Sequence, residues 1–178
     1  MQKDVNLVWV DLEMTGLNPE KDLILEIAVL ITDKDLNIVA EGPDLAINYI
    51  HLPEMCEWVT NAHTTSGLLD KAKSSHISLK EAEVQVFNFI AQYAQKGKSF
   101  LCGNSIWQDK QFLQKHMPSI VEYLHYRIID VSTVKELVKL WYPDSPAAEF
   151  QKVKAHRALD DIKESISELN HYKKHFFI

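Results

Sequence analysis

The sequence has little cysteine, no long hydrophobic run and no concentration of basic residues. Cys56 and Cys102 are its only cysteines, and they form no C-x-x-C motif, so we expect reduced core thiols. No apolar run approaches the ~20 residues that span a bilayer. Residues 1–4 lead directly into a predicted strand, so we expect no signal peptide. These absences predict a cytoplasmic protein that has no membrane partner.

Positive charge is also scarce. The formal net charge at pH 7 is −6, and the 19 Lys and Arg residues form no run. A protein that grips long nucleic acid usually carries a basic face. If the substrate is a nucleic acid, this composition favours contact at a few points in a pocket and argues against long duplexes.

The length and composition fit one ordinary domain. The chain has 178 residues, of which 46% are hydrophobic and 25% charged, as in soluble globular proteins with a sizeable core. The sequence contains no repeat, low-complexity tract or linker. We therefore predict a single domain over residues 1–178, with its core at about residues 5–175.

Strands and helices alternate after an initial group of three strands. The short links between those three strands imply an antiparallel meander. Apolar spacing predicts the later helices, and Ser105 with Gln108 fits a capping box. The predicted class is α/β, a mixed sheet of about five strands (a meander, then parallel strands) with helices on both faces. We expect strands at 7–14, 23–32, 36–50, 99–103 and 127–130, and helices at 79–93, 105–113, 133–141 and 158–172.

Two acidic residues end the first strand. Side chains alternate along a strand, so Asp11 and Glu13 share the face of Trp9, whereas Val10 and Leu12 face the other side. Paired buried carboxylates repel each other and need a counter-charge. A divalent cation such as Mg²⁺ or Mn²⁺ suits hard oxygen donors. An acidic strand end that is simply solvated at a turn is the alternative.

Three further residues extend the candidate site, although each also has an ordinary structural explanation. Asp109 lies in the first turn of a predicted helix, where the helix dipole alone favours an acid. His156 and Asp161 flank the start of the last helix, where a histidine is often a capping or surface residue. Glu26, inside the second strand, could assist a metal site, but a supporting or edge position is the stronger interpretation.

Together these residues resemble the histidine-containing DEDD exonucleases of the ribonuclease H-like fold, and in detail the oligoribonuclease family. The resemblance covers nearly the whole chain. It implies that Asp11, Glu13, Asp109 and Asp161 bind two divalent cations, Mg²⁺ or Mn²⁺, and that His156 is the general base. The matching segments are V-D-L-E-M-T-G-L (10–17), C-G-N-S-I (102–106), Y-R (126–127), D-V-S-T (130–133) and H-R-A-L-D-D-I-K-E-S (156–165).

The resemblance also implies contacts with substrate. In the family, Tyr126 reaches into the site of a partner subunit, so a homodimer is implied. Trp58 has core packing as its alternative, which the sequence alone favours. Trp107 departs from the family, where we expect a small residue. The implied substrate-binding residues are Leu17, Trp58 and His63 at the bases and Ser105, Arg127, Ser132 and, less directly, Thr133 at the terminal phosphate.

The predicted function is 3′-to-5′ hydrolysis of very short RNA, especially dinucleotides, to 5′-mononucleotides. Two metals ~4 Å apart can assist both the attacking and the leaving oxygen, and a histidine can accept a proton near neutral pH. A related exonuclease for longer RNA or DNA ends should carry more basic surface. A catalytically dead binding module should have lost a site residue. A phosphatase with an aspartyl nucleophile should have D-x-D in place of Asp11-x-Glu13.

Overall fold

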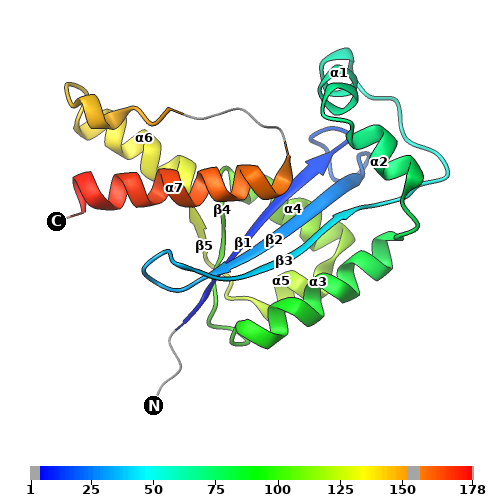
Figure 1. The fold of residues 1–178 in the computed structure, drawn as a ribbon, viewed down its shortest axis with the longest axis horizontal. Coiled ribbons are helices and arrows are strands. Elements are labelled where there is room, and N and C mark those ends of the chain that lie inside the picture. Colours follow the sequence, from blue (N-terminus) through cyan, green and yellow to red (C-terminus); the bar gives the residue numbers. More distant parts are fainter. Residues whose placement is uncertain (1–4, 152–156, 178) are drawn as a thin grey trace.

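A mixed five-stranded sheet forms the centre of the protein. The computed structural model describes residues 5–151 and 157–177. The strand order is β3-β2-β1-β4-β5 (Figure 1). β1–β3 are antiparallel and β4 is parallel to both β1 and β5, which confirms the predicted meander followed by parallel strands. The strands are β1 (Leu7–Met14), β2 (Ile24–Thr32), β3 (Ile38–Ala46), β4 (Leu101–Gly103) and β5 (Ile128–Asp130).

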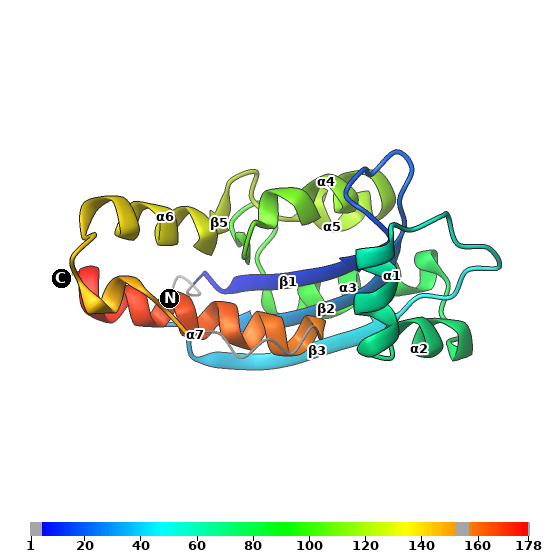
Figure 2. The ribbon, with the colours of Figure 1, turned by 90° about the horizontal axis from the view of Figure 1, so that it is seen from above.

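Helices cover both faces of the sheet. α3, α4 and α5 bury apolar residues against one face, and α6 and α7 do so against the other (Figure 2). α1 and α2 lie beyond the end of the sheet where β1 finishes (Figure 1). None of the helices in the described ranges is long and apolar enough to cross a membrane. The helices are α1 (Glu57–Thr65), α2 (Leu68–Ser74), α3 (Leu79–Tyr93), α4 (Ile106–His116), α5 (Pro118–Tyr123), α6 (Val131–Trp141) and α7 (Ala158–Phe176), with a 3₁₀ turn at Pro146–Ala148.

The alternation along β1 determines which side chains reach which layer. Val10 and Leu12 pack with α3, α4 and α5, whereas Trp9 packs with α6 and α7. The buried Trp9 indole also donates a hydrogen bond of 3.0 Å to Thr32 Oγ1 on β2. Asp11 therefore emerges on the α7 face. The facing predicted from the sequence is confirmed.

The predicted start of α4 is only partly correct. The helix begins at Ile106, but Ser105 has a left-handed backbone (φ 50°) and its side chain makes no capping hydrogen bond. Gln108 instead donates from Nε2 to the carbonyl of Leu17, 2.8 Å away. The predicted capping box is therefore wrong, because Ser105 and Gln108 are held by partners distant in the sequence.

Two other local expectations are also wrong. α6 begins at Val131, where the Asp130 side chain accepts a hydrogen bond from Ser132 N, and not at Thr133. Cys102 is a buried free thiol, but Cys56 is an exposed one.

Candidate active site

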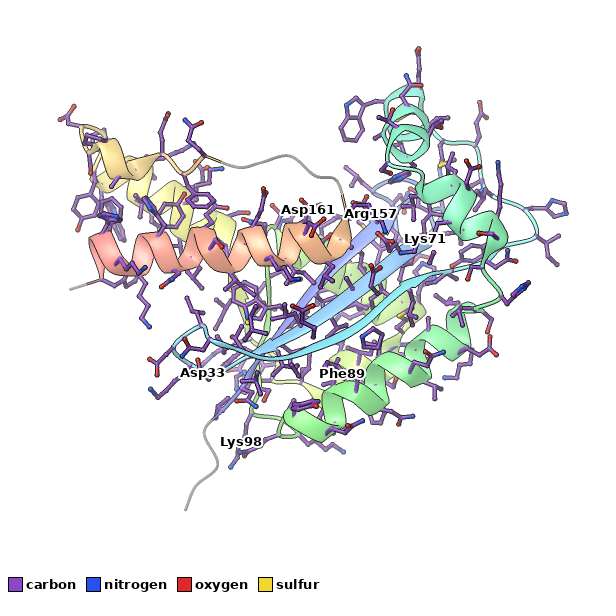
Figure 3. The ribbon with its side chains drawn as sticks, viewed as in Figure 1. Asp33, Lys71, Phe89, Lys98, Arg157 and Asp161 are labelled. Carbon is purple, nitrogen blue, oxygen red and sulfur yellow. The ribbon has the colours of Figure 1, made fainter. Side chains whose placement is uncertain are left out.

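Three acidic side chains meet where β1 ends beneath the start of α7. Asp11 and Glu13 come from β1, and Asp161 comes from the first turn of α7. One carboxylate oxygen from each lies within 4.8 Å of the other two. Figure 3 shows Asp161 near the start of α7, next to Arg157. Two elements far apart in the sequence thus build one acidic cluster.

Asp109 lies beside this cluster but does not belong to the group of three. It is buried in the first turn of α4, and its Oδ1 accepts a hydrogen bond of 3.0 Å from the backbone N–H of Leu12. Its charge nevertheless raises the pKa of Asp11. The structure therefore places all four predicted acidic residues at the same end of β1, with one carboxylate turned to the backbone.

Burial and mutual repulsion both act on the carboxylates of the cluster. Burial, followed by the charges of Asp109 and Glu13, raises the pKa of Asp11 well above its ordinary value. Burial and then the charge of Asp161 raise the pKa of Glu13 to about 7. Burial also raises the pKa of Asp109 to about 7. Closely spaced hard oxygen donors of this kind fit a divalent cation, whose positive charge would offset the repulsion.

His63 connects the cluster to the apolar pocket beside it. The buried ring donates from Nε2 to the carbonyl of Met14, 2.8 Å away, and its Nδ1 lies 3.8 Å from Glu13 Oε2. The hydrogen bond fixes the ring against the end of β1. The same residue lines the apolar pocket.

The pocket is about 470 Å³ and mostly apolar, and Leu17 and Trp58 rise from its rim. Their side chains are 74% and 73% exposed, so core packing of Trp58 is wrong. The Leu17 loop is held by hydrogen bonds from Thr15 Oγ1 and Asn18 N to Asp22. A rigid loop that presents a large apolar side chain to solvent suits stacking against a planar ligand.

A pair of hydroxyl groups lies at the start of α4. Ser105 Oγ and Ser132 Oγ are 3.0 Å apart, and Ser105 N donates to Ser132 Oγ and to Asp130 Oδ1. Thr133 is exposed beside them in the sequence. Arg127 is exposed, and its guanidinium lies 5.1 Å from the centre of the Tyr126 ring. Trp107, the second residue of α4, is exposed as well.

One predicted site residue cannot be placed in the structure, and three charged residues beside the site were not predicted. His156 lies outside the described residues. Lys71, Asp44 and Arg157 were not singled out, although Lys71 and Arg157 both approach the buried carboxylate of Glu26. The sequence signal was Glu26 itself, because a charged residue in an apolar strand requires partners of opposite charge.

Comparisons with known proteins agree with this geometry. The family model described as "Exonuclease" (RNase_T) matches residues 8–169. The chain is 52% identical to the oligoribonuclease of Pseudomonas fluorescens (strain Pf0-1), covering 99% of this chain and 98% of that protein. It is 51% identical to the oligoribonuclease of Pseudomonas putida (strain F1), with the same coverage.

The fold is shared with a larger enzyme. Exonuclease I from Methylocaldum szegediense superposes with a TM-score of 0.77 at 16% identity, over 97% of this chain and 41% of that one. The chain thus spans about two fifths of that enzyme, and the likeness at this identity concerns the fold. Taken with the full-length sequence matches, these findings show that the chain belongs to the oligoribonuclease family of exonucleases.

Proposed function

We propose that the protein is a metal-dependent 3′-to-5′ exoribonuclease that cleaves very short RNA, especially dinucleotides, to 5′-mononucleotides. The observation that carries the proposal is the cluster of Asp11, Glu13 and Asp161 next to an apolar pocket, in a chain whose relatives are named oligoribonucleases. We also propose that residues 1–178 form one exonuclease domain that acts in the cytosol.

The acidic residues would hold two divalent cations, Mg²⁺ or Mn²⁺. Asp11, Glu13 and Asp161 supply the closely spaced oxygens, and Asp109 supplies a fourth carboxylate beside them. When bound, such cations activate the attacking water and stabilise the leaving 3′-oxygen. His156, which immediately precedes Arg157, is proposed to accept the proton of that water, since its ordinary pKa is near ~6.5.

Substrate would be held at its bases and at its terminal phosphate. Leu17 and Trp58 flank the pocket, where bases can stack, and His63 lies at its inner edge. Ser105 and Ser132, together with the guanidinium of Arg127, are proposed to bind the phosphate, because charge-assisted and hydroxyl hydrogen bonds suit its oxygens. Such a cap, on a chain without a basic run, favours substrates only a few nucleotides long.

The test is a time course on 5′-labelled RNA of two and of seven nucleotides, with Mg²⁺ and with EDTA. We expect metal-dependent loss of the dinucleotide that is much faster than loss of the heptamer. Comparable or faster attack on the heptamer would reject the short-substrate assignment and favour an exonuclease for longer ends. Asp11→Asn should abolish turnover with both RNAs, and retained turnover would refute its role as a ligand.

A homodimer in which Tyr126 completes the partner's site is also proposed. Its side chain is 68% exposed, stacks on His125 and lies under the Arg127 guanidinium, so it can reach a second subunit. Asp11→Asn and Tyr126→Ala should each be inactive alone. Mixing them with subunit exchange should restore about a quarter of the wild-type activity, since only mixed dimers hold one complete site. Absence of any recovery, with subunit exchange verified, would contradict a contribution in trans.

A further inference from the structure

A second charged group lies directly next to the acidic cluster but makes different contacts. Glu26 on β2 is paired with Glu13 on β1, so the two side chains emerge on the same face of the sheet. The Glu26 side chain is only 1% exposed. A carboxylate this deeply buried is stable only if opposite charges and hydrogen-bond donors surround it.

Three donors from two other elements converge on Glu26. Lys71 Nζ on α2 donates to Oε1 at 2.6 Å, and the Arg157 guanidinium lies 3.7 Å from the same oxygen. The backbone N–H of Ala158 donates to Oε2 at 3.4 Å. Figure 3 shows Lys71 and Arg157 side by side, with Asp161 next along α7. Both oxygens of Glu26 are therefore engaged away from the three-residue cluster.

These contacts fix the first turn of the helix that carries Asp161. Arg157 is the N-cap of α7 but makes no side-chain capping hydrogen bond. The Glu26 carboxylate instead accepts a hydrogen bond from Ala158 N, one of the first N–H groups of the helix, which have no partner within it. Asp161 N donates to the carbonyl of Arg157 at 2.9 Å. A shift or rotation at Arg157 would thus move Asp161 by a similar amount.

The network contains equal numbers of basic and acidic side chains, namely Lys71 and Arg157 with Glu26 and Asp44. Lys71 also donates to Asp44 on β3 at 3.1 Å, so two basic groups face two acidic ones. Within this network, Oε1 of Glu26 accepts from Lys71 and Oε2 accepts from Ala158 N. This argues that Glu26 supports the cation site and is not itself a ligand.

We propose that Glu26, through Lys71 and Arg157, is a positioning residue that holds the start of α7 so that Asp161 stays within reach of Asp11 and Glu13. The inference rests on the proposed cation site. Its consequence is that cation affinity depends on a residue that does not touch the cation. Partners of metal ligands commonly change metal affinity ~10- to 100-fold when removed.

The experiment measures Mn²⁺ binding to the metal-free full-length protein by calorimetry. Glu26→Gln keeps the size of the side chain and an acceptor for Ala158 N but removes the charge. We expect the Mn²⁺ dissociation constant to rise ~10-fold or more and amide hydrogen exchange at residues 158–162 to accelerate. Asp44→Asn is the matched control, since it removes the other partner of Lys71 without touching α7, and it should change affinity less than about threefold.

A double variant separates positioning from a general loss of stability. Glu26→Gln with Lys71→Met also removes the lysine that has lost its Glu26 partner, so thermal stability should recover while Mn²⁺ affinity stays weak. Recovery of affinity together with stability would overturn the inference, as would unchanged affinity in folded Glu26→Gln. If Glu26→Gln does not fold, Arg157→Gln, at a partly exposed position, gives the same comparison. Failure of the wild-type protein to bind Mn²⁺ would instead refute the proposed cation site.

Discussion

At the scale of single residues, the clearest indication of a ligand-binding surface is the pair of exposed apolar side chains, Leu17 and Trp58, that line the apolar pocket. Leu17 and Trp58 contribute little to folding, because both side chains remain mostly in solvent. The Leu17 loop is nevertheless held by Asp22 and by Gln108 from α4. Ordered backbone beneath an exposed apolar side chain indicates a surface kept for a ligand.

Replacement of Trp58 by alanine should therefore affect binding and not stability. Stacking on an aromatic residue contributes ~1–3 kcal/mol per base, so KM for the dinucleotide should rise about tenfold or more. Tm should stay nearly unchanged, since exposed substitutions usually alter stability by less than ~0.5 kcal/mol. Steady-state kinetics and thermal melts measure both quantities.

Ile50→Ala is the control for that substitution. Ile50 is a more exposed apolar residue than Trp58 and does not line the pocket, so neither KM nor Tm should change. A Trp58→Ala variant with wild-type KM would contradict the stacking role. A large fall in its Tm would show that the indole serves packing after all.

Alternation along β1 was enough to predict that Asp11 and Glu13 share one face of the sheet. Asp161 was identified through the resemblance to known exonucleases, and the structure brings it to the same cluster. The orientation of Asp109 was not predictable, because its partner, the N–H of Leu12, is 97 residues away. The core-packing alternative for Trp58 was wrong, because composition alone cannot tell an exposed indole from a buried one.

At the scale of elements, patterns within one segment predicted the helix boundary correctly. Boundaries that depend on contacts between distant segments were predicted incorrectly. The predicted helix at residues 79–93 coincides with α3, whose Ser78–Glu81 capping box is entirely local. The start of α4 showed the opposite, since Ser105 bonds to Ser132 and Asp130 from α6 and β5. α6 likewise begins at the Asp130 cap. Local hydrogen-bond rules hold where no tertiary partner competes for the same groups.

At the scale of the whole molecule, the sheet is built around a concentration of negative charge that costs stability. Burial raises the pKa of Glu13 from 4.5 to about 7, and burial also raises the pKa of Asp109 to about 7. Without a cation, the folded protein therefore holds protons at these groups that the unfolded chain releases at lower pH. Folded-state pKa values above the unfolded ones make stability fall as pH rises through this window.

The metal-free protein should accordingly melt at a lower temperature at pH 8 than at pH 6. The difference should be about 5 °C or more, given that ~1 kcal/mol corresponds to ~2–4 °C at this size. Glu13→Gln should reduce the pH dependence by removing one of the titrating carboxyls, whereas Glu54→Gln, at an exposed position, should leave it unchanged.

Mn²⁺ or Mg²⁺ should raise Tm more at pH 8 than at pH 6, because ionised carboxylates bind cations and protonated ones do not. Thermal melts in EDTA and in excess cation measure these differences. If Tm in EDTA rises with pH equally in the wild type and in Glu13→Gln, the acidic cluster does not oppose folding.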